Sequence, residues 1–176
     1  MQFFDTHAHI GLIYDDPIEQ LRVIQEAKQA NVTRIVSICN SLHDFTKVYA
    51  NLKSVPGIYH AVGVSPSEVT TPGKDWIQTV ENSLKLPNVV ALGETGLDYY
   101  KGKENKEKQI ELFEKMLALA EKHELPAIVH SRKAMQDTYK IMKKHSVVGS
   151  MHSYQGSGEM AEEFEKPNGI ITSSDL

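Results

Sequence analysis

Short β-branched segments alternate along this chain with longer segments whose apolar residues recur at helical spacing. The helices are expected at residues 17–30, 44–53, 74–84, 106–123, 135–145 and 158–165. The strands are expected at residues 2–6, 34–38, 58–63, 89–94, 127–130, 147–152 and, more weakly, 169–172. Strands that alternate with helices of these lengths form βαβ units around a parallel sheet. The pattern therefore predicts an α/β protein with about seven parallel strands.

Chain length limits how far such a sheet can close. A complete barrel of eight βα units takes roughly 250 residues, whereas this chain has 176. Periodicity does not distinguish an open sheet from a closed one, and no stretch of the composition marks a linker or a second domain. We therefore expect one domain over residues 1–176, long enough to bury a sizeable core.

Charge and cysteine content limit the function and the compartment. Lys and Arg number 19 against 23 Asp and Glu, so the chain has no electrostatic attraction for nonspecific nucleic-acid binding, and a phosphate substrate would need a metal or a local basic cluster. Cys39 is the single cysteine, so no internal disulfide forms, and it is expected at a buried strand end rather than as a nucleophile. No apolar run is long enough to span a membrane. A cytoplasmic location without membrane contact is therefore expected.

Metal-binding side chains fall where the expected strands end. His7 and His9 are two positions apart, so on an extended segment they point to the same side. Glu94, His130 and His152 stand at the ends of three later strands, and the carboxyl-terminal strand ends of a parallel barrel meet on one face. One such histidine alone is more simply a polar tip bonded to a carbonyl, but five convergent side chains predict a metal site. Because they exceed what one tetrahedral ion needs, two divalent ions (Zn, Mn or Mg) are expected.

Other polar residues are expected outside this set. The remaining histidines fall at helix ends or at the opposite ends of strands and are expected to be surface or capping residues: His43, His60, His123 and His145. The segment 101–108 carries four lysines. It either contacts a phosphate backbone or forms a solvated helix start, balanced by Glu104 and Glu107.

Four segments carry a resemblance to a known family. They are Phe-Asp-Thr-His-Ala-His at residues 4–9, Gly-Glu-Thr-Gly-Leu-Asp-Tyr-Tyr at 93–100, Val-His-Ser-Arg at 129–132 and His-Ser-Tyr-Gln-Gly-Ser at 152–157. In order and spacing they resemble the signature blocks of TatD-type deoxyribonucleases, and the resemblance extends from residue 1 to about residue 172. The second and third blocks are highly specific, whereas the wider amidohydrolase superfamily shares the His-x-His pattern.

The resemblance implies a TIM-type (β/α) barrel and a metal-dependent hydrolase that cleaves DNA. It implies that His7 and His9 hold a first metal ion and that His130 and His152 hold a second. Glu94 would bridge both ions and serve as a catalytic residue. Ions roughly 3.5–4 Å apart would polarise the phosphoryl oxygen, lower the pKa of a bridging water and stabilise the leaving oxygen.

Three residues are candidates for substrate contact. Arg132, next to His130, either contacts phosphate as a catalytic guanidinium fork or forms a structural salt bridge at the barrel rim. Tyr100, like its neighbour Tyr99, either stacks on a base or packs at the rim. Ser65 occupies a position where the family usually carries a histidine, and its hydroxyl can hydrogen-bond a phosphate oxygen.

The end of the family's barrel has no counterpart here. Members close the barrel with a strand carrying Glu-Thr-Asp, whose aspartate completes the first metal site and takes the proton from water. Asp175 is not assigned this role because no strand follows it. We therefore expect a barrel incomplete at its C-terminus, with about seven of eight strands, two exposed edges and feeble activity. Either the chain is a truncated product, or another chain covers the gap by self-association.

Three functions stay open at the level of sequence. The first is a DNase that cleaves phosphodiester bonds. The second is an amidohydrolase that acts on a small-molecule C–N or lactone bond, which Glu94 disfavours because the bridging group there is often a carboxylated lysine. The third is a non-catalytic remnant that still binds metal.

Overall fold

The computed structural model describes the backbone of residues 1–172, and the side chains in that range except those at positions 166–168 and 172. The strands are β1 (Phe3–Ala8), β2 (Val32–Ser37), β3 (Ile58–Val62), β4 (Val89–Asp98), β5 (Ala127–Arg132), β6 (Gly149–Met151) and β7 (Ile170–Thr172). The helices are α1 (Ile10–Ile13), α2 (Pro17–Gln29), α3 (Leu42–Leu52), α4 (Trp76–Ser83), α5 (Lys106–Lys122), α6 (Met135–Met142) and α7 (Gly158–Asn168). Asp175 lies outside the described residues.

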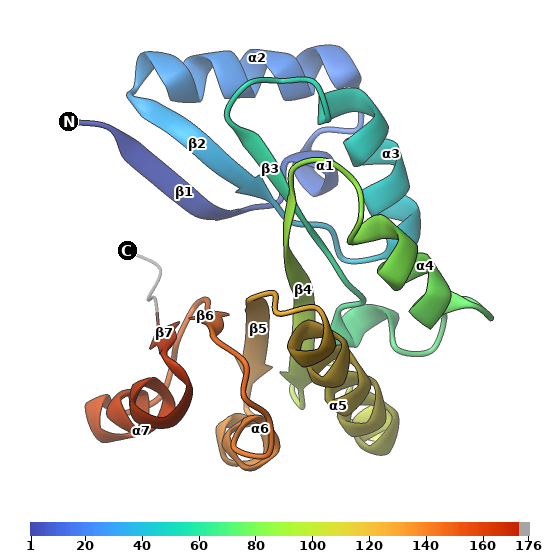
Figure 1. The fold of residues 1–176 in the computed structure, drawn as a ribbon, viewed down its shortest axis with the longest axis vertical. Coiled ribbons are helices and arrows are strands. Elements are labelled where there is room, and N and C mark those ends of the chain that lie inside the picture. Colours follow the sequence, from blue (N-terminus) through green and yellow to red (C-terminus); the bar gives the residue numbers. More distant parts are fainter. Residues whose placement is uncertain (173–176) are drawn as a thin grey trace.

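The strands form one sheet in which each strand pairs in parallel with the next one in sequence, from β1 to β7. The sheet curls, with helices α2 to α7 along its outer side and an open side between β1 and β7 (Figure 1). Within residues 1–172, β1 and β7 do not pair with each other. The expected α/β fold, a TIM-type barrel with about seven of its eight strands, is confirmed.

Local contacts set the element boundaries. Asp16 caps α2 by accepting a hydrogen bond from the Ile18 amide, as its position before Pro17 predicts. Helix α3 begins two residues earlier than expected because the Ser41 hydroxyl accepts from the Asp44 amide. Strand β4 continues past residue 94 because its last four residues pair with residues 129–132 of β5.

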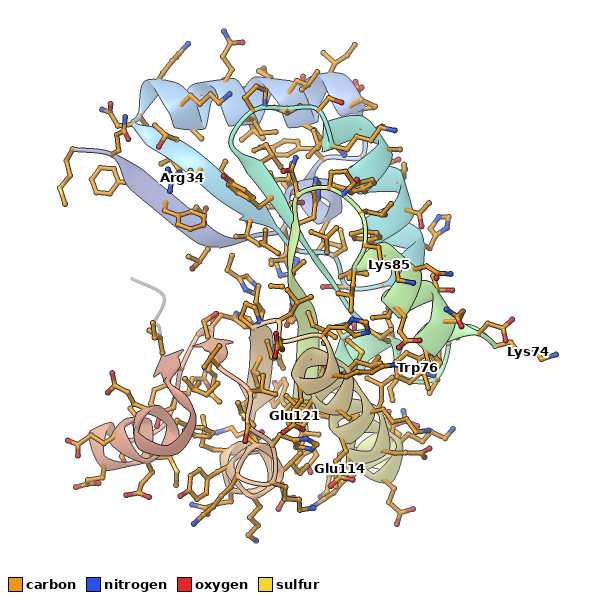
Figure 2. All side chains as sticks on the ribbon, viewed as in Figure 1. Arg34, Lys74, Trp76, Lys85, Glu114 and Glu121 are labelled. Atoms are coloured by element: carbon orange, nitrogen blue, oxygen red, sulfur yellow. The ribbon has the colours of Figure 1, made fainter. Side chains whose placement is uncertain are left out.

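The main core lies between the sheet and the outer helices. Phe113, Met116 and Leu117 of α5 are fully buried against it. Trp76, at the start of α4, packs on the same core (Figure 2). A smaller apolar cluster joins neighbouring strands separately from this core, and its members are Val36, Ile38, Ala61, Ala91 and Ile128. No helix of the described part is both long enough and apolar enough to cross a membrane.

The concave side of the sheet carries a groove of about 530 Å³, here called the inner groove. Its lining is mainly apolar and includes Phe4, Val36, Tyr59, Val90, Ile128 and Ile171. Arg34 also lines it, on the side of β1 and β2 (Figure 2). On the two edge strands Phe4 and Ile171 remain 51% and 66% exposed. The curled sheet thus leaves apolar surface in contact with solvent.

Candidate metal centre

The carboxyl-terminal ends of the strands surround a cavity of about 360 Å³. The histidines and the glutamate predicted to bind metal come from different strands and meet here. His9, Glu94, His130 and His152 line the cavity directly, and His7 stacks on His152 with ring centroids 3.9 Å apart. The predicted convergence of the five side chains is therefore found.

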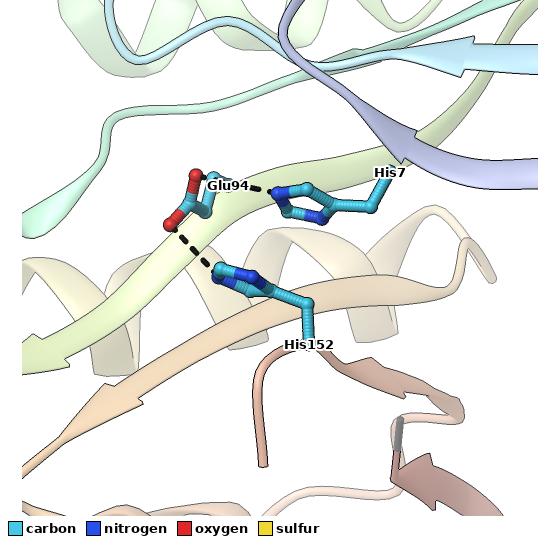
Figure 3. Close-up of side chains that lie close together, drawn as sticks. All are labelled: His7, Glu94 and His152. Carbon is cyan, nitrogen blue, oxygen red and sulfur yellow. Dashed lines mark hydrogen bonds and ion pairs between the residues drawn. The ribbon is translucent and has the colours of Figure 1, made fainter. Parts of the chain in front are cut away.

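The first histidine pair comes from the end of β1. His7 lies within the strand and His9 one residue beyond it, and their Nε2 atoms are 3.1 Å apart. The Asp5 carboxylate accepts a hydrogen bond from the His7 amide at 2.9 Å, where the pairing of β1 with β2 is irregular. Figure 3 shows His7 and His152 side by side, with Glu94 facing both.

Glu94 lies at the centre, and each of its carboxylate oxygens faces one pair of histidines. Oε2 is 3.3 Å from His9 Nε2 and 3.8 Å from His7 Nε2. Oε1 is 3.0 Å from His130 Nδ1 and 3.1 Å from His152 Nε2. The side chain is almost wholly buried. One carboxylate thus connects two imidazole pairs, and His130 Nδ1 lies 3.2 Å from His152 Nε2 within the second pair.

Close packing of β4 against β5 brings Glu94 and His130 together. Gly96 pairs with His130, and a Cβ atom at Gly96 would lie 2.0 Å from the His130 carbonyl oxygen. The backbone φ of Gly96 is +139°, a conformation that residues with a side chain rarely adopt. Glycine is therefore required at this position for the two strands to approach. This explains the second glycine of the Gly-Glu-Thr-Gly block.

Two predicted positions differ from the structure in detail. Glu94 and His130 were expected at the ends of their strands, but both lie inside, because β4 continues to Asp98 and β5 to Arg132. Glu94 is therefore buried within the paired part of the sheet rather than at the end of its strand.

The electrostatics of the centre favour an anionic carboxylate among imidazoles. Burial alone would raise the pKa of Glu94, but hydrogen bonds with His130, His152 and His9 hold it well below its usual range. Burial, together with the neighbouring His152, lowers the pKa of His7 to about 4, so its ring is neutral at neutral pH. Burial also acts to lower the pKa of His130, but the contacts with Glu94 and Asp98 outweigh it and raise that pKa.

The donor set fits a divalent metal ion. Ligand atoms of His7, Glu94 and His152 all lie within 4.8 Å of one another. Imidazole nitrogen and carboxylate oxygen are the ligands that Zn²⁺ and related ions prefer. Nitrogen atoms only 3.1–3.2 Å apart cannot all carry protons, so lone pairs remain directed at the centre. The role of the five side chains as metal ligands stays a prediction, and the chemistry of this donor set supports it.

The predicted substrate residues are divided: Ser65 lines the cavity, whereas Arg132 and Tyr100 are not among the described residues that line it. Ser65 is buried and lines the cavity, with its hydroxyl 2.6 Å from that of Ser67. The Arg132 guanidinium lies 4.1 Å from the ring centre of Tyr100, which is 64% exposed. Among the described residues no ion pair involves Arg132, so the salt bridge, one of its two expected roles, is not found there, and the phosphate contact stays a prediction.

Tyr99 packs against the main core and is not among the described residues that line the cavity. Its hydroxyl donates to the Asp137 carboxylate at 3.0 Å, and the Lys106 ammonium pairs with the same carboxylate. Lys106 therefore belongs to a helix start, as one of the two expectations for residues 101–108 had it. Lys101, by contrast, lines the cavity.

His60 is a correction to the sequence analysis. It was expected at the surface or at a cap, but its side chain is fully buried in β3 against Phe45 and Tyr49. The reason is that β3 is covered by α3 and that His60 is the middle residue of this strand, so its side chain is not at the surface. The other three histidines agree with expectation: His43 is exposed, His123 pairs with Glu81, and His145 pairs with Glu121. Cys39 is buried as expected, and burial raises the pKa of its thiol to about 12.

Sequence reasoning missed Asp98 as a cavity residue. It ends β4, lines the cavity and places Oδ2 3.3 Å from His130 Nε2. A carboxylate four positions after Glu94 in a strand lies on the same face of the sheet, so alternation could have identified it once the strand was extended.

Comparison with known proteins agrees with this geometry. A model of the family described as TatD related DNase matches residues 4–175. The metal-dependent hydrolase YabD of Bacillus subtilis is 36% identical over 94% of this chain and 66% of its own length. Putative deoxyribonuclease tatdn3 of Danio rerio is 28% identical over 92% of this chain and 65% of its own. The crystal structure of YjjV, a TatD homologue from Escherichia coli, superposes with a TM-score of 0.85 at 28% identity, covering 97% of this chain and 66% of that one. The chain thus spans about two thirds of the length of these proteins.

Proposed function

This chain belongs to the TatD family of metal-dependent hydrolases, and from that premise we propose that it cleaves phosphodiester bonds in DNA. The observation that carries the proposal is the division of Glu94 between two histidine pairs. One relative in zebrafish is named a putative deoxyribonuclease, which supports DNA as the substrate class.

The division of Glu94 supports two ions rather than one. His7 and His9 with Oε2 would hold the first ion, and His130 and His152 with Oε1 would hold the second. Zn²⁺, Mn²⁺ or Mg²⁺ bound in this way would supply a Lewis acid for the phosphoryl oxygen and lower the pKa of a bound water.

The protein's own groups prepare the site. Glu94 remains ionised, since its pKa is held low, and contributes the negative charge that attracts cations. The neutral ring of His7 keeps a lone pair available. Outside the cavity lining, Arg132 would contact a phosphate oxygen, and Tyr100, which it stacks on, would stack on a base. The buried hydroxyl of Ser65 would donate to a second phosphate oxygen.

Metal removal and a panel of substrates test the proposal. Chain stripped by chelation should be inactive, and adding back Zn²⁺, Mn²⁺ or Mg²⁺ should restore cleavage of single- and double-stranded DNA and of bis(p-nitrophenyl) phosphate. The panel also contains RNA, an N-acyl amide and a lactone. Hydrolysis of only the amide or lactone would replace the proposal with the amidohydrolase alternative. Metal binding without any hydrolysis would point to a non-catalytic remnant.

A further inference from the structure

Asp98 is a carboxylate in the cavity wall that is not among the five candidate metal ligands. It is 9% exposed, lies at the end of β4 and forms part of the cavity wall. Its carboxylate faces a candidate ligand, His130, from the side opposite to Glu94. Any role of Asp98 toward His130 depends on the proposed metal centre, to which His130 would be a ligand.

The backbone of Asp98 is held from α5. Gln109 is 1% exposed, and its Oε1 accepts from the Asp98 amide at 2.8 Å. Its Nε2 donates to the carbonyl oxygens of Asp98 at 3.1 Å and Gly102 at 2.8 Å. One buried amide therefore fixes both the end of β4 and the loop that follows.

The carboxylate of Asp98 is fixed as well. Oδ1 accepts hydrogen bonds from the amides of Tyr100 and Lys101, both at 2.9 Å. With Oδ1 occupied by two donors, the side chain cannot exchange its oxygens freely. Oδ2 is consequently directed at the imidazole of His130, 3.3 Å from Nε2.

The His130 ring lies between two carboxylates. Nδ1 is 3.0 Å from Glu94 Oε1, and Nε2 is 3.3 Å from Asp98 Oδ2. Nε2 is buried and has no aligned hydrogen bond in the described part of the chain, and the Asp98 carboxylate is an acceptor 3.3 Å away. When Nδ1 binds an ion it carries no proton, and the remaining proton sits on Nε2, where it needs an acceptor.

We propose that Asp98 is a positioning residue that accepts the Nε2 proton of His130 and so presents Nδ1 to the metal. A carboxylate behind a metal-bound histidine fixes both the tautomer and the orientation of the ring. Asp98 itself touches neither the ion nor the substrate.

Asp98→Asn tests this with little change in shape. The amides of Tyr100 and Lys101 hold the asparagine oxygen, so its NH₂ group faces Nε2–H of His130, donor against donor. The matched control is Asp137→Asn, which alters a rim carboxylate that contacts Tyr99 and Lys106 instead of a histidine ring. Zinc affinity is measured by titration of the metal-free chain, together with the melting temperature and the Nε2 proton signal of His130 in the zinc-loaded protein.

We expect Asp98→Asn to weaken zinc binding by about 10- to 100-fold, while the control binds as the unsubstituted chain does. In the proton NMR spectrum of the zinc-loaded unsubstituted chain, the Nε2 proton of His130 should resonate far downfield, as it does in an imidazole hydrogen-bonded to a carboxylate. Asp98→Asn should abolish that signal. Equal zinc affinity in both variants would overturn the role of Asp98 and leave the proposed function intact. If Asp98→Asn does not fold, the zinc-loaded unsubstituted chain still tests the proposal. Zinc coordination through Nε2 of His130, instead of Nδ1, would contradict it. A chain that binds no divalent ion overturns both the proposed function and this inference.

Discussion

Single residues determine what the candidate centre can do, and Glu94 is the clearest example. Its two oxygens lie within 3.8 Å of four imidazole nitrogens that come from three different parts of the chain. Each histidine contacts one oxygen, whereas the glutamate contacts both pairs. Loss of its charge should therefore affect both pairs at once.

Glu94→Gln tests this expectation. The amide keeps the size of the side chain but removes the negative charge and turns a donor toward one histidine pair. We expect both ions to be lost together, with affinity at least about tenfold lower than after removal of any single histidine. Metal analysis of the purified variant gives the number of ions per chain. Glu104→Gln is the control, because Glu104 is an exposed residue of the same cavity. Two ions per chain in the Glu94 variant would rule out the bridging role.

Protonation of the buried His60 should destabilise the fold at low pH. Burial lowers its pKa to about 4, whereas histidine in an unfolded chain titrates near 6.5. Between these values the unfolded state binds more protons, so the free energy of unfolding falls as the pH drops from about 6.5 toward 4, by up to about 3 kcal/mol. Above pH 6.5 the residue has no such effect.

His60→Leu should reduce this pH dependence, since the new side chain does not titrate. Denaturant unfolding at neutral pH and near pH 4.5 measures the difference for each variant. In the His60 variant the free energy of unfolding should still depend partly on pH, because the pKa of His7 is also lowered to about 4. His43→Leu, at an exposed position, is the control and should leave the slope unchanged. An unchanged slope in the His60 variant would show that its protonation does not limit stability.

At the scale of elements, the order of strands and helices was predictable, but several boundaries were not. Apolar periodicity located the strands and the long helices because burial on one face imposes it. It could not show that β4 continues to Asp98, since that extension depends on pairing with β5. Nor could it place α1, whose four residues are too few to show a helical period. The five convergent side chains were predicted from strand ends, whereas Asp98 and the burial of His60 required the register and packing of the sheet.

Gly96 makes the pairing of β4 with β5 depend on one position. Gly96→Ala should push the strands apart, because its Cβ would lie 2.0 Å from the His130 carbonyl oxygen at a φ of +139°. We expect a loss of at least about 2 kcal/mol in the free energy of unfolding, together with weaker metal binding. Gly158→Ala is the control, since a Cβ there would meet no atom within 4 Å. Thermal unfolding and metal titration measure both effects; an alanine variant as stable as its control would show that the strands tolerate the separation.

At the scale of the whole molecule, the inner groove is the apolar surface that the incomplete sheet leaves exposed. Phe4 and Ile171 stand exposed on its opposite edges, and apolar side chains line the space between them. A contiguous apolar surface of this kind promotes association. The self-association expected from sequence remains a proposal, with the inner groove as the surface that would be covered.

Dye binding and sedimentation test this expectation. The 176-residue chain should bind an apolar fluorescent dye and should sediment with a concentration-dependent mass. Replacing Phe4 and Ile171 with serine should reduce both effects. Serine at Leu12 and Ile13 removes a similar exposed apolar area from α1 and is the matched control. A monomer that binds no dye would show that the inner groove is covered within the chain itself.

The stacking of His7 on His152 has a consequence for the order of events during translation. These rings belong to the beginning of the chain and to the segment after β6, yet they lie 3.9 Å apart. A nascent chain that has passed only β5 through the ribosomal exit tunnel already contains Glu94 and His130 but lacks the last imidazole. The centre is therefore among the final parts of the described chain to assemble, because a shorter nascent chain lacks one of the five side chains. The five side chains can come together only after nearly all of the described sheet has been synthesised.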